Sequence, residues 1–227
     1  METLGNRDIV KAIGTGLGDW RKLAQPLAAR FRPVDRVMGA VFVAAVAKAA
    51  GDAGLEPDIR WGRGGVDVTL CTVDGVTGRR GVTAADLELA GAISDLAREQ
   101  GLTAVPGEVT QVELALDTAD HSALSPFWSA LLTGDSGNAR ADEVLDPTDR
   151  VPPMWFQSTD PHEPPRQRWH LDVWLAPEVA DARVEAAVAA GGTVVDASNA
   201  PSYTVLADPD GNRVCVCTAL DRDGAGD

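Results

Sequence analysis

The sequence predicts an α+β protein made of two compact domains, and three observations lead to this prediction. The chain has 227 residues, which fits two domains of about 100 residues each. Hydrophobic residues make up 44% of it, enough to bury cores and too many for a disordered chain. Helical and alternating hydrophobic patterns follow one another in both halves. We expect domains at residues 1–103 and 109–219, with a linker at 104–108 and a polar tail at 220–227.

The first half carries two helical segments with a strand between them. Residues 35–50 repeat apolar side chains on one helix face, and glycines end the segment. This face comprises Val37, Met38, Val41, Phe42, Ala45, Val46 and Ala49. Residues 66–70 alternate in the manner of a half-buried strand. Thr83, followed by Asp86 three residues later, predicts an N-cap and a helix that runs to about residue 100.

The second half contains an internal repeat. Residues 111–117 and 170–175 are alternating strands, and helical segments follow them at 122–132 and 178–190. Each copy ends in a further strand, at 154–157 in the first and 214–217 in the second. A turn of Gly and Asn chemistry at 208–212 joins the last hairpin. We therefore expect two β-α-β-β-β copies.

Charge and cysteine content limit the partners and the compartment. The net charge is −14, which disfavours nucleic acid and anionic membrane surfaces as partners. No apolar run reaches the roughly 20 residues that span a bilayer, and the N-terminus lacks the features of a secretion signal. Three cysteines form no even disulfide framework. We expect a cytoplasmic protein.

The order of motifs in the first half follows one known family. Residues 55–58 read Leu-Glu-Pro-Asp, residues 73–74 read Val-Asp, and residues 81–86 read Gly-Val-Thr-Ala-Ala-Asp. This order resembles the pterin-4a-carbinolamine dehydratases, whose frame is His-His-Pro-Asp, a strand, a His-Asp pair and Gly-(Leu/Val)-Thr-x-x-Asp. On that frame the three site histidines fall on Leu55, Glu56 and Val73. The histidines of this chain all lie in its second half: His121, His162 and His170.

The substituted positions limit what the first domain can catalyse. Histidine serves general acid–base catalysis because it titrates near neutral pH. Leu55 and Val73 cannot transfer protons, whereas Glu56 is a catalytic candidate in a buried setting and otherwise a solvated loop residue. Asp74 is a candidate ligand-binding residue or a turn cap. Trp61 offers a stacking surface for a flat ring, or a core or interface residue. We do not expect ordinary carbinolamine dehydratase activity.

The second half resembles the vicinal-oxygen-chelate superfamily, which includes glyoxalases and bleomycin-resistance proteins. The resemblance spans residues 109–218. Its carriers are Arg-Trp-His-Leu-Asp at 168–172, the glycine pair at 191–192 and Asp-Pro-Asp-Gly-Asn-Arg-Val-Cys-Val at 208–216. It implies the paired β-α-β-β-β fold. It does not decide the activity, because the superfamily includes enzymes and binding proteins alike. The order of the two halves also resembles a bacterial fusion of a dehydratase-like and a glyoxalase-like domain.

The same resemblance implies four metal-ligand positions, from the first and last strands of each copy. These positions fall on Gln111, Gln157, His170 and Cys215. None of them is a carboxylate, which hard ions prefer, and two amides do not usually complete a zinc site. We therefore expect no metal and no other cofactor. If a metal did bind, His170 and Cys215 would form the core of its site.

Without a metal, the four side chains remain directed at the inner face of the two copies. His170 is then a catalytic candidate, or a structural histidine satisfied by a neighbour. Cys215 is a nucleophile only if a cation activates its thiol, and otherwise a packing residue. Trp174 shares the parity of His170 and so faces the same way. The candidate ligand-binding residues of this domain are Gln111, Gln157, Trp155, Trp174 and Cys215.

Three classes of function remain open. The first is an enzyme that acts on a small molecule without metal, as a lyase, isomerase or cyclase of the kind found in specialised metabolism, and we favour this class. The second is a small-molecule binding or self-resistance protein of the bleomycin-resistance kind. The third is an interaction module, since dehydratase-like folds can dimerise through their sheets. Residual 4a-hydroxytetrahydropterin dehydratase activity is a further alternative. We expect a homodimer that binds a small molecule.

Overall fold

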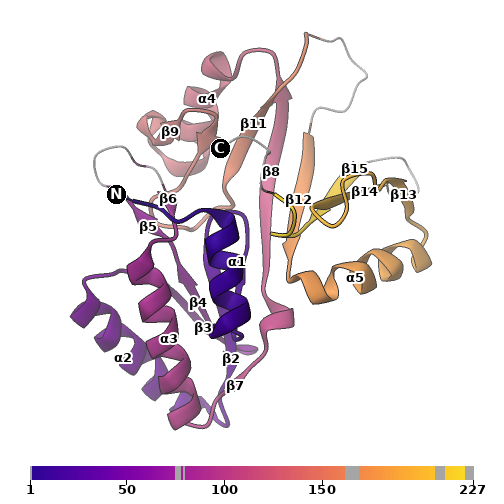
Figure 1. The fold of residues 1–227 in the computed structure, drawn as a ribbon. Coiled ribbons are helices and arrows are strands. Elements are labelled where there is room, and N and C mark those ends of the chain that lie inside the picture. The colour runs from indigo at the N-terminus through magenta and orange to yellow at the C-terminus, as the bar shows by residue number, and fades with distance from the viewer. Residues whose placement is uncertain (1, 75–77, 79, 162–168, 208–212, 223–227) are drawn as a thin grey trace. The chain divides into compact units, whose positions relative to one another are not determined.

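The computed structural model describes residues 2–74, 78, 80–161, 169–207 and 213–222 (Figure 1). The predicted turn at 208–212, His162 and the end of the polar tail lie outside these residues. The chain divides into two compact units, one formed by residues 1–110, 175–179 and 219–227 and the other by residues 111–174 and 180–218. Both helices and sheets are present, so the predicted α+β class is confirmed. Within the described ranges, no helix has the length and apolar character needed to cross a membrane.

The first unit is built on an antiparallel sheet with the strand order β1-β2-β4-β3, and β7 pairs with β2. The strands are β1 (Trp20–Lys22), β2 (Leu27–Arg32), β3 (Asp58–Gly62), β4 (Gly65–Leu70) and β7 (Thr103–Ala104). A separate pair joins β5 (Thr72–Val73) to β6 (Arg80–Gly81). The helices are α1 (Asn6–Thr15), α2 (Arg36–Ala53) and α3 (Ala84–Glu99), and the short helix η1 (Pro106–Glu108) follows. One buried cluster joins side chains of the sheet to all three α-helices.

Helix α2 is apolar around more of its circumference than it buries. Phe42, Val46 and Ala50 are buried in the core, as a helix face requires. Val37 and Val41, which belong to the predicted core face, are instead 70% and 47% exposed. The predicted stripe was therefore too wide, because an apolar side chain at a helix position does not by itself show which way the helix is turned.

The motif Gly-Val-Thr-x-x-Asp forms a helix cap. The Thr83 hydroxyl accepts from the Asp86 amide, and the Asp86 carboxylate accepts from the Thr83 amide at 2.7 Å, which completes a capping box at the start of α3. The hydroxyl of Thr72 also donates to the Asp86 carboxylate at 2.8 Å. These donors satisfy a carboxylate that is only 2% exposed. The predicted cap is confirmed, and the family motif has a structural role in this chain.

The second unit contains the two predicted copies in one eight-stranded sheet, with the strand order β13-β14-β15-β12-β8-β11-β10-β9. The first copy comprises β8 (Thr110–Thr118), α4 (His121–Thr133), η2 (Ser136–Asn138), β9 (Ala139–Arg140), β10 (Glu143–Val144) and β11 (Met154–Ser158). The second comprises β12 (Trp169–Leu175), α5 (Pro177–Ala189), β13 (Thr193–Asp196), β14 (Tyr203–Ala207) and β15 (Arg213–Cys217). The first strands of the two copies, β8 and β12, lie at the centre of the sheet. Each pairs on its outer side with the last strand of its own copy, β11 or β15. The β-α-β-β-β repeat is therefore present in the structure.

Alternation along the strands separates a packed face of this sheet from a polar one. Leu116, Met154 and Phe156 form a buried cluster, against which Leu114 and Trp128 also pack. Because neighbouring residues of a strand point to opposite sides, Glu113, Ala115 and Asp117 lie on the other face. This second face, called the site face below, carries the side chains of interest in β8, β11, β12 and β15.

Candidate functional site

The positions of the lost histidines in the first unit are not joined into an enclosed site. Leu55 is half-buried and packs against the core of this unit. Glu56 is exposed in the connection between α2 and β3, and Val73 is 52% exposed on β5. Glu56 was a catalytic candidate only if its carboxyl group was buried. This condition is not met.

The two other candidates of the first unit have local roles. The Asp74 carbonyl accepts a 2.7 Å hydrogen bond from the Gly78 amide, and Gly78 has a positive φ of 70°. Trp61 is 44% exposed on the edge strand β3. A side chain at Gly39 would place its Cβ 2.8 Å from the indole Nε1 of Trp61, so this glycine allows the ring to lie against α2.

The site face brings residues of both copies of the second unit together. Strands β8 and β12 are neighbours in the sheet. Trp174 contacts Glu113, and His170 contacts Asp117. The two strands therefore run antiparallel. Asp172 therefore lies opposite Ala115. In the parallel pairs outside them, Ala115 pairs with Trp155 and Asp172 pairs with Cys215.

The sequence repeat predicted which residues of the two copies are equivalent. The strand register moves these equivalent positions by two residues. Cys215 corresponds to Trp155 and not to Gln157, and His170 corresponds to Glu113 and not to Gln111. The sequence echo was aligned on its first residues, whereas the strands are matched at their centres. Strand pairing sets such a register through contacts that the linear pattern does not contain.

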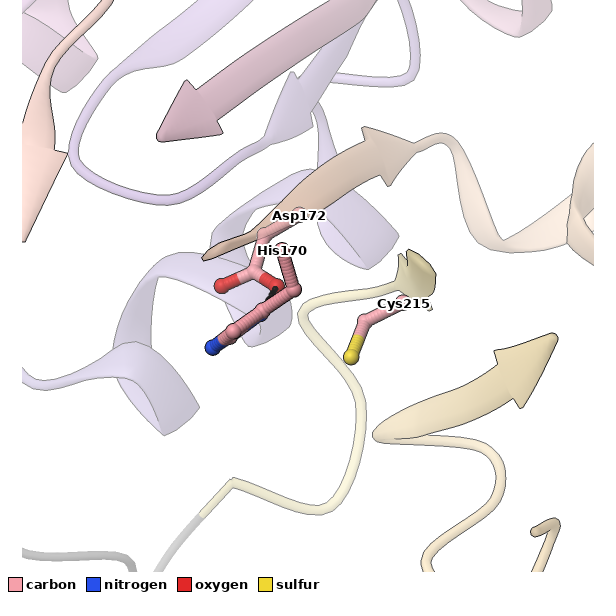
Figure 2. Close-up of side chains that lie close together, drawn as sticks. All are labelled: His170, Asp172 and Cys215. Atoms are coloured by element: carbon pink, nitrogen blue, oxygen red, sulfur yellow. Dashed lines mark hydrogen bonds and ion pairs between the residues drawn. The ribbon is translucent and has the colours of Figure 1, made fainter. Parts of the chain in front are cut away.

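His170 lies between two carboxylates on the site face. Its Nδ1 is 3.1 Å from Asp172 Oδ1, and its Nε2 is 3.5 Å from Asp117 Oδ1. The His170 side chain is 17% exposed, while those of Asp117 and Asp172 are 13% and 9% exposed. Figure 2 shows His170 and Asp172 from β12 together with Cys215 from β15.

These neighbours raise the pKa of His170 from its ordinary value of 6.5 to about 10. The hydrogen bond with Asp172 is the largest cause, and a hydrogen bond with Cys215 is the next. Burial acts in the opposite direction, and the charge of Asp172 adds to the rise. His170 is therefore an imidazolium at neutral pH, and both ring nitrogens act as donors.

Two tryptophans hold the carboxylates of the site face in place. The indole of Trp155 donates from Nε1 to Asp172 Oδ2 at 3.0 Å, and its ring meets the His170 ring edge to face with centroids 5.9 Å apart. The indole of Trp174 donates to Glu113 Oε2 at 2.7 Å, and both residues are buried. The structure thus brings together four of the predicted residues of this domain: His170, Trp155, Trp174 and Cys215.

The two predicted glutamines lie at different depths. Gln111 is half-buried near the start of β8, and Gln157 is exposed on β11, beside Asp117 in the register. The sequence reasoning did not select the carboxylates Glu113, Asp117 and Asp172. The signal was present, because Asp172 shares the parity of His170 and Glu113 and Asp117 share one parity on β8.

The side-chain composition of this face also tests the expectation of a metal-free site. Within the part of the chain that the structure describes, His170, Asp172 and Cys215 offer possible ligand atoms within 4.8 Å of one another. The expectation of a metal-free site was based on the four family positions, and Asp172 is a carboxylate outside that set. A metal ion, however, requires a neutral imidazole with a free lone pair. Both ring nitrogens of His170 face carboxylate oxygens, at 3.1 Å and 3.5 Å, and this arrangement suits a protonated ring.

Comparison with protein families agrees with both halves of this description. Residues 2–96 match the family model for pterin 4 alpha carbinolamine dehydratase, and residues 113–217 match the model for a glyoxalase-like domain. A search of curated proteins found no match. The chain is thus a fusion of a pterin 4 alpha carbinolamine dehydratase domain, without the site histidines of that family, and a glyoxalase-like domain.

Proposed function

We propose that this protein is a small-molecule enzyme that works by metal-independent proton transfer on the site face of its glyoxalase-like domain. Both domains are of families whose members act on or bind small molecules. The observation that carries the proposal is the position of His170 between Asp172 and Asp117. The proposed reaction is of the lyase, isomerase or cyclase type, in which a proton moves and no redox change occurs.

The two ring nitrogens of His170 have different tasks in this proposal. The 3.1 Å contact with Asp172 fixes the orientation of the ring through Nδ1. The contact of Nε2 with Asp117 is 3.5 Å long, beyond the usual length of a hydrogen bond between charged groups. Nε2 is therefore the nitrogen that can donate its proton to a substrate oxygen or carbon. Asp117, 3.5 Å from Nε2, is the carboxylate proposed to accept a proton from the substrate.

The surroundings of His170 favour a flat, largely apolar substrate with a hydrogen-bond acceptor. The Trp155 ring contacts the imidazole edge to face, which gives an aromatic surface beside the acid. A substrate carbonyl hydrogen-bonded to a cationic donor becomes more acidic at its α-carbon, and proton removal there leads to isomerisation, elimination or cyclisation.

Hydrogen exchange in D2O tests this function with a panel of aromatic and alicyclic ketones as probes. The purified wild-type protein should introduce deuterium at the α-carbon of at least one ketone, as measured by mass spectrometry. H170Q should lower the rate by about 10²- to 10⁴-fold, the usual contribution of general acid–base catalysis. A matched control is His121→Gln, the same change at the first residue of α4, outside the site face. Equal exchange by wild type and H170Q across the panel contradicts the proposal.

A binding or self-resistance protein is the second candidate, and the Trp155 surface favours it. A binder would hold a member of the panel without exchanging its protons, and W155A would weaken binding more than H170Q. Calorimetry beside the exchange measurement separates the two functions.

We also propose that the protein is a cytoplasmic homodimer. None of the three cysteines forms a disulfide, which fits a reducing compartment. Val34, Val37 and Val41 are exposed in and before α2, and their burial against a second copy would remove apolar surface from water.

A further inference from the structure

Two side-chain contacts cross from β8 to β12 on the site face, and the proposed proton transfer uses one of them. Asp117 lies 3.5 Å from Nε2 of His170. Four residues away on each strand, the indole of Trp174 donates a 2.7 Å hydrogen bond to the carboxyl group of Glu113. Because β8 and β12 are neighbouring strands of one sheet, both contacts depend on the same strand pairing (Figure 1).

The two contacts occupy equivalent positions in the two copies of the repeat. Glu113 corresponds to His170, and in the same register Asp117 corresponds to Trp174. Each contact therefore joins the first strand of one copy to the first strand of the other. One contact holds a histidine beside a carboxylate, and its equivalent holds an indole beside a carboxyl group. Equivalent positions thus carry different side chains, and only one pair has the residues for acid–base chemistry.

The contact between Trp174 and Glu113 is the more firmly held of the two. Glu113 is 4% exposed and Trp174 is 7% exposed, so water competes little for this hydrogen bond. Its length of 2.7 Å is at the short end for a bond from a nitrogen donor. The contact of Asp117 is longer, and both of its side chains are more exposed. The longer contact is therefore less able to hold the two strands in register.

The position of Asp117 relative to His170 depends on this register. The hydrogen bond from Trp155 holds Asp172, which lies on the same strand as His170 and therefore does not place a residue of β8. A slip of one residue between β8 and β12 would turn Asp117 to the packed face. A slip of two residues would move it by about 7 Å along the strand and out of reach of the ring.

We propose that Trp174 and Glu113 are positioning residues for the proposed reaction, because their hydrogen bond fixes the register of β8 against β12 and so holds Asp117 at His170. This inference rests on the proposed function, since it concerns the same acid–base pair. Neither positioning residue needs to touch the substrate. The duplicated contact thus has two roles, proton transfer at one position and strand alignment at its equivalent.

Ketone exchange in D2O, measured over a range of ketone concentrations, separates positioning from substrate binding. W174F removes the indole donor, and E113L removes the acceptor. Each should lower kcat by about 10- to 10²-fold with KM little changed, since displacement of a catalytic group by about 1 Å has a cost of that order. E113Q should retain most of the rate, because an amide oxygen also accepts the indole hydrogen bond. The double variant W174F/E113L should have a kcat no lower than the weaker single variant, because both changes remove one contact.

Two control variants separate this effect from a general loss of stability. W169F changes a tryptophan of the same strand that is 39% exposed and points to the packed face. V144A removes volume from the buried cluster of the first copy, on β10. Both should keep the wild-type kcat, and urea unfolding measures the stability that each variant has lost.

NMR of nitrogen-15-labelled histidine at pH 6.5 tests the position of Asp117 without any substrate. D117N gives the ring signals of His170 without its carboxylate neighbour. In W174F and E113L the His170 signals should move from their wild-type positions toward those of D117N. In E113Q and V144A they should stay close to wild type.

The inference is overturned if W174F and E113L, in folded protein, lower kcat no more than V144A or leave the His170 signals unchanged. Circular dichroism shows whether each variant is folded, and E113L decides where W174F is not. If W174F exchanges ketones as fast as wild type, proton transfer stands and the positioning role falls. If wild type exchanges no ketone, the proposed function falls, and the NMR comparison then decides whether the contact holds Asp117 at His170.

Discussion

The indole of Trp155 donates a 3.0 Å hydrogen bond to the carboxylate of Asp172, whose other oxygen contacts His170. This bond joins the last strand of the first copy to the first strand of the second. The catalytic candidate is thus held by both copies of the repeat, although it belongs to one. A site of this kind needs the paired sheet to be formed before its side chains reach their positions.

Trp155→Phe should therefore destabilise the second unit by more than its lost volume suggests. The substitution keeps an aromatic ring and removes the donor from a carboxylate whose side chain is 9% exposed. Loss of a partner by a buried charged acceptor costs about 1–3 kcal/mol. Urea unfolding followed by far-UV circular dichroism measures this difference.

Trp61→Phe is the matched control, because Trp61 is 44% exposed and lies in the first unit. It should change the free energy of unfolding by less than Trp155→Phe. Equal losses for the two variants would show that the hydrogen bond to Asp172 contributes little.

The raised pKa of His170 leads to a second prediction. Its imidazolium should persist through neutral pH and titrate near pH 10, because Asp172 and then Cys215 raise the pKa of the ring. Asp172→Asn should lower the midpoint, since the hydrogen bond with Asp172 is the largest cause of the rise. NMR of nitrogen-15-labelled histidine measures this titration, and H170Q assigns the signal.

The same shift sets the direction of a pH effect on stability. The folded pKa lies above the unfolded value of about 6.5. The contribution of His170 is therefore complete below pH 6.5 and declines as the pH rises toward 10. The difference in unfolding free energy between wild type and H170Q should shrink from pH 6 to pH 9. A difference that grows over this range would contradict the raised pKa.

The sequence predicted much of this fold because its patterns are local. The capping box at Thr83 and the two β-α-β-β-β copies depend on neighbours a few residues apart. It did not reveal α1 or the central strand β2. Residues 27–32 are buried at nearly every position, so they lack the alternation that marks a half-exposed strand.

The site was predicted in part for the same reason. His170, Trp174 and Cys215 were found from motifs and parity. Asp117 approaches His170 only because β8 and β12 pair in one register, and a shift of one residue would turn it away. The raised pKa of the ring was likewise hidden, since it depends on Asp172 and on Cys215, which the pairing of β12 and β15 brings together.

The third prediction concerns metal binding at the carboxylates beside His170. We expect calorimetric titration with zinc to show no stoichiometric binding near neutral pH, because the ion must displace a proton from a ring held by Asp172 and Asp117. EDTA should leave the ketone exchange rate unchanged. A rate that falls with EDTA and returns with zinc would make His170, Asp172 and Cys215 a metal centre.

The exposed valines of α2 give a fourth prediction, on assembly. Val37→Glu should shift the protein from dimer to monomer, because it would place a charge within an apolar surface. Native mass spectrometry measures the oligomeric state. Lys48→Glu is the control, since Lys48 is an exposed α2 residue away from Val37. A wild-type protein that remains monomeric at micromolar concentration contradicts the proposed dimer.

The last prediction concerns the activity that the first domain has lost. Purified protein should not accelerate dehydration of a 4a-carbinolamine above the buffer rate. Leu55 and Val73 have no exchangeable side-chain proton, and Glu56 is exposed. An exposed carboxyl group in a loop is not held against a substrate and is a poor acid–base catalyst for that reason. Stopped-flow absorbance with a chemically generated carbinolamine measures the rate, and Glu56→Gln is the matched variant. Dehydration that is faster than buffer and disappears in Glu56→Gln would show that this single carboxylate replaces the family's histidines. Acceleration that survives Glu56→Gln but disappears in H170Q would instead assign the reaction to the glyoxalase-like domain.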